Sequence, residues 1–175
     1  MVLDRGDYLI VADKVVETLM ADTGIGGLRE SGGPPVRTIE PRIRREAKLY
    51  SKYELPLIGV DVVRKREEPA PSSNLVDKIF EMEFLILCRG GDRELESERA
   101  KKIASRLEKV LKAQNLPEHQ FLGLPGLIEG SQGVVLVSIK ETFFESRYFE
   151  DASGRNPEVA SIVSAEVVIP SGIVL

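Results

Sequence analysis

Apolar residues recur at helical spacing along residues 4–22 of the chain. They form one stripe on a helix: Tyr8, Leu9, Ala12, Val15, Val16, Leu19 and Met20. This spacing predicts an amphipathic helix that buries one face. Asp4 or Asp7 is suited to cap its start, and Gly24 is suited to the left-handed position that ends a helix.

A second helical pattern runs from Asp92 to about Asn115. Its apolar stripe consists of Leu95, Ala100, Ile103, Ala104, Leu107, Val110 and Leu111. Asp92 follows two glycines and carries a side chain that commonly caps a helix. Glutamates crowd the first turns and lysines stand near the end, so the charges match the helix macrodipole. The pattern therefore predicts a second amphipathic helix.

Alternation with a period of two predicts the strands. The clearest strand covers residues 75–88, and one of its faces is apolar: Phe80, Met82, Phe84, Ile86 and Cys88. Its other face mixes acids with apolar residues, which is typical of an antiparallel strand with one covered face. A shorter strand is predicted over residues 57–63, entered through Pro56.

The C-terminal part of the chain predicts two further strands. Residues 133–149 form one long strand, or one bent at a bulge. The expected shared face of that strand contains Val135, Val137, Ile139, Phe143 and Phe149. Residues 151–157 are rich in turn formers, and residues 159–169 alternate through a last strand that Pro170 ends.

This order of elements predicts an α+β fold, an antiparallel or mixed β-sheet with two helices packed on one face. At 175 residues the chain has the size of one domain, which we place at residues 1–175. Long loops are expected at residues 23–56, 64–74 and 116–132. Loops of this length are commonly used for binding.

Composition and charge narrow the class of protein. Apolar residues make up 42% of the chain and charged residues 30%, which is typical of a soluble globular protein. The formal net charge is −4, which disfavours a dedicated nucleic-acid binder. The N-terminal residues lack the pattern of a signal peptide, and no apolar run has the length of a membrane span. We therefore expect a protein that is cytoplasmic or is assembled in the cytoplasm.

Candidate catalytic chemistry is sparse. The Gly24–Gly27 run follows a predicted helix rather than a strand, so it favours a helix end over a phosphate loop. Cys88 and His119 are the only cysteine and histidine, too few for a zinc site. Cys88 lies on an apolar strand face, where a thiol is normally inert.

Paired carboxylates give a second possibility for chemistry. Glu81 and Glu83 share one side of a strand, with Cα atoms about 6.6–6.8 Å apart from the strand rise. Such a pair can do acid–base chemistry or bind a metal, but an exposed or partner-facing sheet surface is the simpler reading. We expect no catalytic residue, no cofactor and no metal.

A basic segment stands out in this acidic chain. Residues 36–52 hold six cations and two acids, Glu40 and Glu46. Three more cations follow one short strand later. The segment predicts a surface that binds an acidic protein partner or, as an alternative, nucleic acid. A solvated loop would also explain the cluster of cations. As interface candidates we take Arg37, Arg42, Arg44, Arg45, Lys48, Lys52, Arg64, Lys65, Arg66, Glu81 and Glu83.

The layout resembles the tail-terminator and minor-tail family of tailed phages, and the related head–tail completion proteins. The pieces that carry the resemblance are the helix around Val11–Met20 with Gly24–Gly27 after it, Pro56–Val60, Phe84–Leu87, Asp92–Leu111, Val134–Ile139 and Val163–Ile169. The resemblance covers nearly the whole chain and includes no single diagnostic motif.

The resemblance implies a structural role without catalytic residues. Subunits of such proteins form a ring, often a hexamer, that caps the tail tube and offers a surface to the head connector. It implies a place in the virion tail, with assembly in the cytoplasm of the bacterial host. Two other classes stay open: a nucleic-acid-binding module that uses residues 37–52, and a small enzyme with its site in the long loops.

Overall fold

The computed structural model describes residues 6–31, 35–44, 50–69, 76–116, 136–151 and 154–169, with no side-chain account of residues 147–156. The elements in these segments are α1 (Asp7–Met20), β1 (Thr38–Glu40), β2 (Leu57–Pro69), β3 (Val76–Arg89), α2 (Arg93–Ala113), β4 (Leu136–Asp151) and β5 (Gly154–Ile169). No helix in these segments is both long and apolar enough to cross a membrane.

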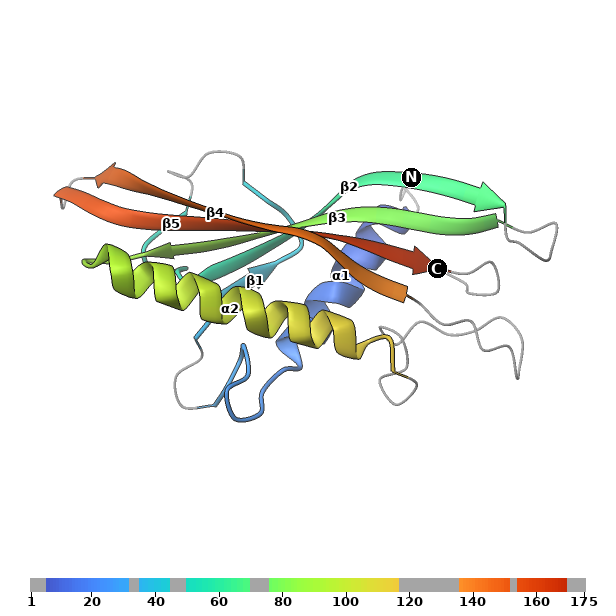
Figure 1. Ribbon diagram of the computed structural model, residues 1–175, viewed down its shortest axis with the longest axis horizontal. Coiled ribbons are helices and arrows are strands. Elements are labelled where there is room, and N and C mark those ends of the chain that lie inside the picture. The colour runs from blue at the N-terminus through green and yellow to red at the C-terminus, as the bar shows by residue number, and fades with distance from the viewer. Residues whose placement is uncertain are drawn as a thin grey trace, which may run out of the picture.

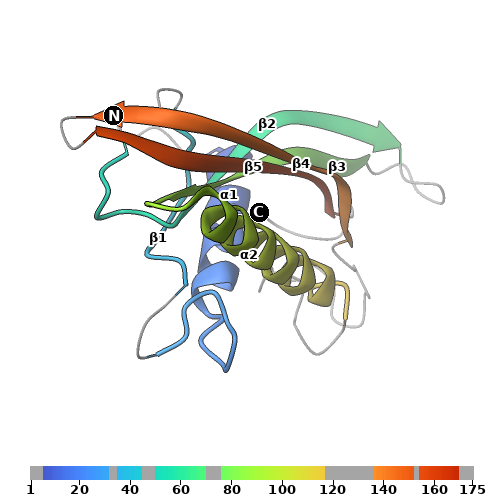
Figure 2. The ribbon, with the colours of Figure 1, turned by 60° about the vertical axis from the view of Figure 1, so that its left-hand side comes forward.

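The five strands form one open sheet in the order β1-β2-β3-β5-β4 (Figure 1). β1 runs parallel to β2, and all the other neighbours are antiparallel. The sheet is therefore mixed. The β2–β3 hairpin and the β4–β5 hairpin project in opposite directions from the centre of the sheet (Figures 1 and 2).

Both helices pack on the same face of the sheet (Figure 2). α1 lies under β2, while α2 runs under β5, β3 and β4. The alternation in β3 explains this arrangement, because Phe80, Met82, Phe84, Ile86 and Cys88 are all buried toward the helices. The predicted α+β fold, with two helices on one face of a mixed sheet, is confirmed.

The opposite sheet face, called here the open face, has a small core of its own at one end. Tyr50 and Leu55 pack there against Leu57, Leu87 and Ala160. The segment before β2 thus folds over the end of the open face. The sequence gives no periodic signal for this cluster, because an irregular segment supplies two of its members.

The prediction of a loop over residues 64–74 is wrong for residues 64–69. β2 continues to Pro69, and its outer half pairs with β3 from Val76 onward. The polar sequence of this half reflects its exposure, while cross-strand pairing keeps it in the sheet. The loop predicted at 23–56 also contains β1, which aligns Thr38 with Leu57. The predicted loop at 116–132 lies almost entirely outside the described residues.

The caps predicted for the first helix are wrong. Gly6 precedes α1 with an extended backbone, and Ala21 ends α1 in a right-handed conformation. The left-handed glycine is Gly26, with φ 70°, inside the following turn. α1 therefore ends without a glycine in the left-handed position. Tyr8 and Leu9 of the predicted stripe are about half exposed.

A β-bulge between Ile139 and Glu141 reverses the alternation of β4. Before the bulge, Val137 and Ile139 face the helices as expected. After it, Phe143 pairs with Ile162 on the open face and is 54% exposed. The predicted shared face of Val137, Ile139 and Phe143 is therefore wrong beyond the bulge. The last strand also starts earlier than expected, because Gly154 already pairs with Asp151.

The predicted cap of α2 is confirmed: the Asp92 carboxylate accepts hydrogen bonds from the amides of Glu94 and Leu95. The buried stripe of α2 differs from the predicted stripe in its first turns. Leu95 is 63% exposed, whereas Glu96 is buried at the core-facing position of the first turns. A Cβ atom at Gly90 would lie 2.2 Å from Glu96 Oε1, so glycine there leaves room for the carboxylate.

Candidate interaction surfaces

Arg44, a central candidate of the basic segment, is part of the fold. Its guanidinium lies 2.7 Å from Glu54 Oε1 and 3.0 Å from Glu40 Oε2. It also stacks over the Tyr50 ring, while its backbone amide donates to the Tyr50 hydroxyl at 2.6 Å. The hydrogen bond from Arg44 lowers the pKa of Glu54. Arg44 therefore anchors this segment and is poorly placed to bind a partner.

Other cations of the basic segment are exposed. Arg37 and Lys52 have exposed side chains, and within the described residues neither contacts a carboxylate. Arg42 contacts Glu40 at 3.2 Å and keeps 67% of its side chain exposed. Arg45 and Lys48 lie outside the described residues. Among the four described cations of the segment, the available positive charge therefore lies on Arg37, Arg42 and Lys52, whereas Arg44 is engaged within the fold.

The basic segment lies against one end of the open face. A Cβ atom added to Gly59 of β2 would lie 2.7 Å from the carbonyl oxygen of Arg42 and 3.2 Å from a side-chain carbon of Ile43. Gly59 therefore permits the close approach of this segment to the sheet. With Tyr50 and Leu55 in the small core, the segment covers the end of the sheet, while its cations Arg37 and Lys52 remain exposed.

The cations of β2 are also largely paired within the chain. Arg66 reaches across the open face, with Glu81 Oε1 at 2.6 Å and Glu166 Oε1 at 2.8 Å. Lys140 contacts the other oxygen of Glu166. The hydrogen bond from Lys140 lowers the pKa of Glu166, and Arg66 adds to this effect. Arg64 contacts Glu81 at 3.8 Å only and stays exposed. These charges bind four strands together.

Lys65 points to the helical side. Its ammonium lies 2.9 Å from Asp7 Oδ2 in the first turn of α1, and Lys78 contacts the same oxygen at 2.9 Å. The hydrogen bonds from Lys65 and Lys78 lower the pKa of Asp7. Sequence proximity suggested that Arg64, Lys65 and Arg66 act together, but the strand period sends Lys65 to the opposite face.

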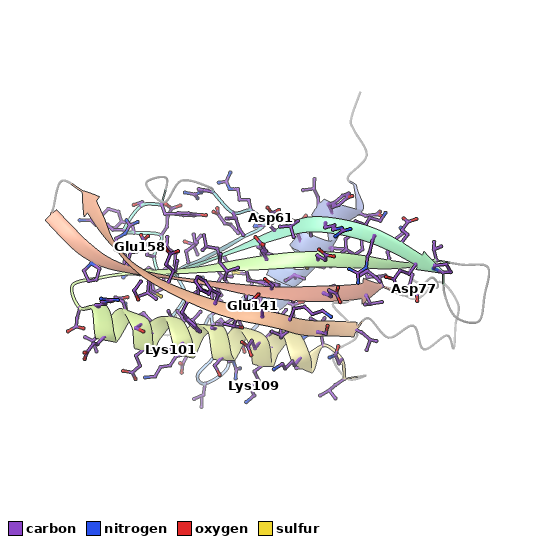
Figure 3. The ribbon with its side chains drawn as sticks, turned by 45° about the horizontal axis from the view of Figure 1, so that its top comes forward. Asp61, Asp77, Lys101, Lys109, Glu141 and Glu158 are labelled. Atoms are coloured by element: carbon purple, nitrogen blue, oxygen red, sulfur yellow. The ribbon has the colours of Figure 1, made fainter. Side chains whose placement is uncertain are left out.

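An acidic row crosses the open face next to the paired charges. Asp61, Glu83, Ser164 and Glu141 are successive register partners on β2, β3, β5 and β4. Figure 3 shows Asp61 and Glu141 on the two outer strands of this row. None of its three carboxylates forms an ion pair with another described residue. Glu81 and Glu83, predicted as a pair, therefore differ: Glu81 is neutralised and Glu83 is not.

An apolar row lies directly beside the acidic row. It consists of Gly59, Leu85, Ile162 and Phe143, again one residue from each strand. Phe143 is 54% exposed and Ile162 is 38% exposed. β4 forms the edge of the sheet, so its outer backbone groups have no strand partner in the described residues. Exposed apolar side chains on a long edge strand are typical of an interaction surface.

The candidate catalytic groups do not converge in the described residues. Cys88 is fully buried, and burial raises the pKa of its thiol to about 12, so the thiolate nucleophile is scarce at neutral pH. The described residues contain no group of three or more histidine, cysteine, aspartate or glutamate side chains arranged to hold a metal ion. His119 lies outside the described residues.

Comparisons with known proteins find likeness in structure rather than in sequence. No family model matches the sequence, and no curated protein matches it. Among solved structures, the chain is similar to one described as "Virion of native gene transfer agent (GTA) particle". The likeness has a TM-score of 0.41 and 11% sequence identity, and it covers 93% of this chain and 99% of that chain. At this level of similarity, function has to be argued from the residues of the chain itself.

Proposed function

We propose that this protein is a non-catalytic structural subunit of a phage or prophage tail, a ring-forming tail terminator or head–tail joining component. The observation that carries the proposal is the open face, where Phe143 and Ile162 are exposed beside acids that form no ion pair with another described residue. Apolar surface of this kind on an edge strand needs a partner to leave water.

The distribution of charge supports self-association. The acidic row lies on the open face of the sheet, while Arg37 and Lys52, which contact no described carboxylate, are exposed near the segment that covers the end of that face. Two unlike and complementary surfaces on one subunit favour head-to-tail contacts, and head-to-tail contacts close into rings when the rotation allows. The family resemblance of the sequence implies the same kind of assembly.

Light scattering coupled to size-exclusion chromatography tests the proposal over a range of protein concentrations. We expect the wild-type mass to rise from one subunit to a defined multiple. Phe143→Ser should keep the fold and lower the assembled fraction, because it removes apolar contact area from the open face. The control is Leu95→Ser, which removes an exposed apolar side chain from α2, on the other side of the molecule's sheet from the open face.

Two results would contradict the proposal. One is a wild-type protein that stays a single subunit at every concentration, both alone and when mixed with purified tail-tube protein. The other is equal assembly of the wild type and Phe143→Ser with reduced assembly of Leu95→Ser, which would place the contact on the helical layer. Strong salt-dependent binding to duplex DNA would support the nucleic-acid alternative instead.

A further inference from the structure

A polar cavity of about 350 Å³ lies where β3 leads into α2. Four cations line it: Arg37, Lys52, Arg89 and Arg99, and the remaining wall is Leu55 with two prolines. These cations come from four separate parts of the chain, so only the folded protein brings them together. No carboxylate is part of the lining.

Two of these cations are held in place by carboxylates behind the cavity. Arg89 Nε lies 2.9 Å from Glu158 Oε2, and Glu158 is fully buried. Arg99 Nη1 lies 3.0 and 3.1 Å from the two oxygens of Glu96, which is itself buried under Gly90. These pairs fix the position of the arginines and neutralise about half of the positive charge around the cavity.

The other two cations supply the excess charge. The side chains of Arg37 and Lys52 are exposed, and no described carboxylate contacts either of them. Lys52 stays near the Tyr53 ring, with Nζ 5.2 Å from its centroid. A cavity lined by two exposed cations that no described carboxylate contacts, and by two arginines oriented by carboxylates, is suited to an oxyanion.

We propose that this cavity receives a carboxylate side chain from the acidic row of a second copy of the chain, one of Asp61, Glu83 and Glu141. This inference rests on the proposed self-assembly. Within the described residues the carboxylates of the acidic row have no ion partner, and Arg37 and Lys52 contact no carboxylate, so a head-to-tail contact would pair both sets of charges. Arginine side chains bind carboxylates with two parallel hydrogen bonds, which fixes the orientation of the subunits.

The distribution of charge around the cavity favours a protein carboxylate over a nucleic-acid phosphate as its ligand. Non-specific DNA binding depends on several cations along the backbone, whereas this cavity offers two that contact no described carboxylate. The open face carries Asp61 and Glu83, which have no ion partner among the described residues and would repel the phosphates of a nucleic acid. The chain as a whole carries a net charge of −4.

Zero-length carbodiimide cross-linking tests the contact directly, because it joins lysine amines only to carboxylates in close contact. We would mix isotopically labelled and unlabelled protein under assembling conditions and identify the cross-linked peptides by mass spectrometry. The expected product links Lys52 of one copy to Asp61, Glu83 or Glu141 of the other. Assembled protein with no Lys52 cross-link between copies would overturn the inference.

Charge reversal gives a second and independent test. Arg37→Glu with Lys52→Glu should raise the concentration needed for assembly roughly tenfold or more, because like charges then meet at the contact. Glu83→Lys with Glu141→Lys should do the same. A mixture of the two double variants should assemble again, since each cavity then meets a row of opposite charge. The matched control is Lys101→Glu with Lys109→Glu on α2 (Figure 3).

The outcomes separate this inference from the proposed function. If the Arg37→Glu, Lys52→Glu protein assembles at the same concentration as the wild type, the cavity contact is overturned. Self-assembly itself is then retained as a proposal. A wild type that never assembles overturns both. Duplex DNA binding that is lost in the same double variant, without any effect on assembly, assigns the cavity to phosphate and overturns the carboxylate partner. Thermal melting of each variant shows whether the fold is retained.

Discussion

At the scale of single residues, Asp22 joins three parts of the fold. Its carboxylate accepts a hydrogen bond from Arg106 Nε of α2 at 2.8 Å and one from the Leu28 amide at 2.8 Å. The hydrogen bond from Arg106 is the main cause that lowers the pKa of Asp22. Asp22 therefore connects the turn after α1 to the second helix, and its charged form is the one that stabilises the folded state.

The pH dependence of this contact has a definite sign. A lowered pKa in the folded state gives stability that is present above the unfolded pKa, near 3.8, and is lost as the pH falls through the folded pKa. We expect Asp22→Asn to lower the free energy of unfolding by about 1–3 kcal/mol at pH 7. Urea unfolding should show this difference shrinking below about pH 4.

The control for this prediction is Glu98→Gln. Glu98 pairs with Lys102 on the exposed face of α2, where both side chains are largely in water. Such a pair contributes little, so the variant should unfold close to the wild type at pH 7. A difference between wild type and Asp22→Asn that stays constant from pH 7 down to pH 3 would show that the charge of Asp22 is unimportant.

At the scale of the elements, α2 has one buried face and one exposed face. Leu107 is fully buried among the residues of the main core, while Lys101 is exposed on the same helix. We expect Leu107→Asp to unfold the protein, because a buried charge without a partner costs several kcal/mol. Lys101→Asp should stay within about 0.5 kcal/mol of the wild type.

Circular dichroism during heating measures both variants. The expected result is a folded Lys101→Asp protein with a melting temperature near that of the wild type, and a Leu107→Asp protein without a cooperative transition. Ile103→Asp should behave like Leu107→Asp, because Ile103 is 3% exposed. Similar melting temperatures for Leu107→Asp and Lys101→Asp would mean that this face of α2 is not in the core.

At the scale of the whole molecule, the two kinds of surface have different roles in the proposed assembly. Exposed ion pairs contribute about 0–1 kcal/mol each, whereas buried apolar area contributes in proportion to its size. Attraction between Glu83 and the cavity lined by four cations, called here the cation cavity, should therefore set the orientation of the subunits. The apolar contact of Phe143 and Ile162 should hold them together.

Salt separates these two contributions. We expect sedimentation velocity to show weaker and slower assembly at high ionic strength, because screening shortens the range of the charges. Assembly should persist in part, because the apolar contact of Phe143 does not depend on screening. Complete loss of assembly at high salt would contradict this division, and so would assembly that is indifferent to salt.

Local patterns in the sequence determined much of the fold. The Asp92 cap, the stripe through Ile103 and Leu107, and the alternation over Phe80–Cys88 were read correctly as a helix and a core strand. Each of these signals is contained in one element, where the backbone period alone decides which side chains share a face. The α+β class and the side of the sheet that carries both helices follow from the same periods.

Only the tertiary structure decided which surfaces remain free. Arg66 pairs with Glu166 one hundred positions along the chain, so the charge of Arg66 is satisfied by a strand that no local pattern connects to it. The bulge before Glu141 moves Phe143 to the open face through the register of β4 against β5. The cation cavity likewise gathers side chains from four separate segments. Composition and periodicity describe neighbours along the chain, whereas pairing, register and exposure depend on neighbours in space.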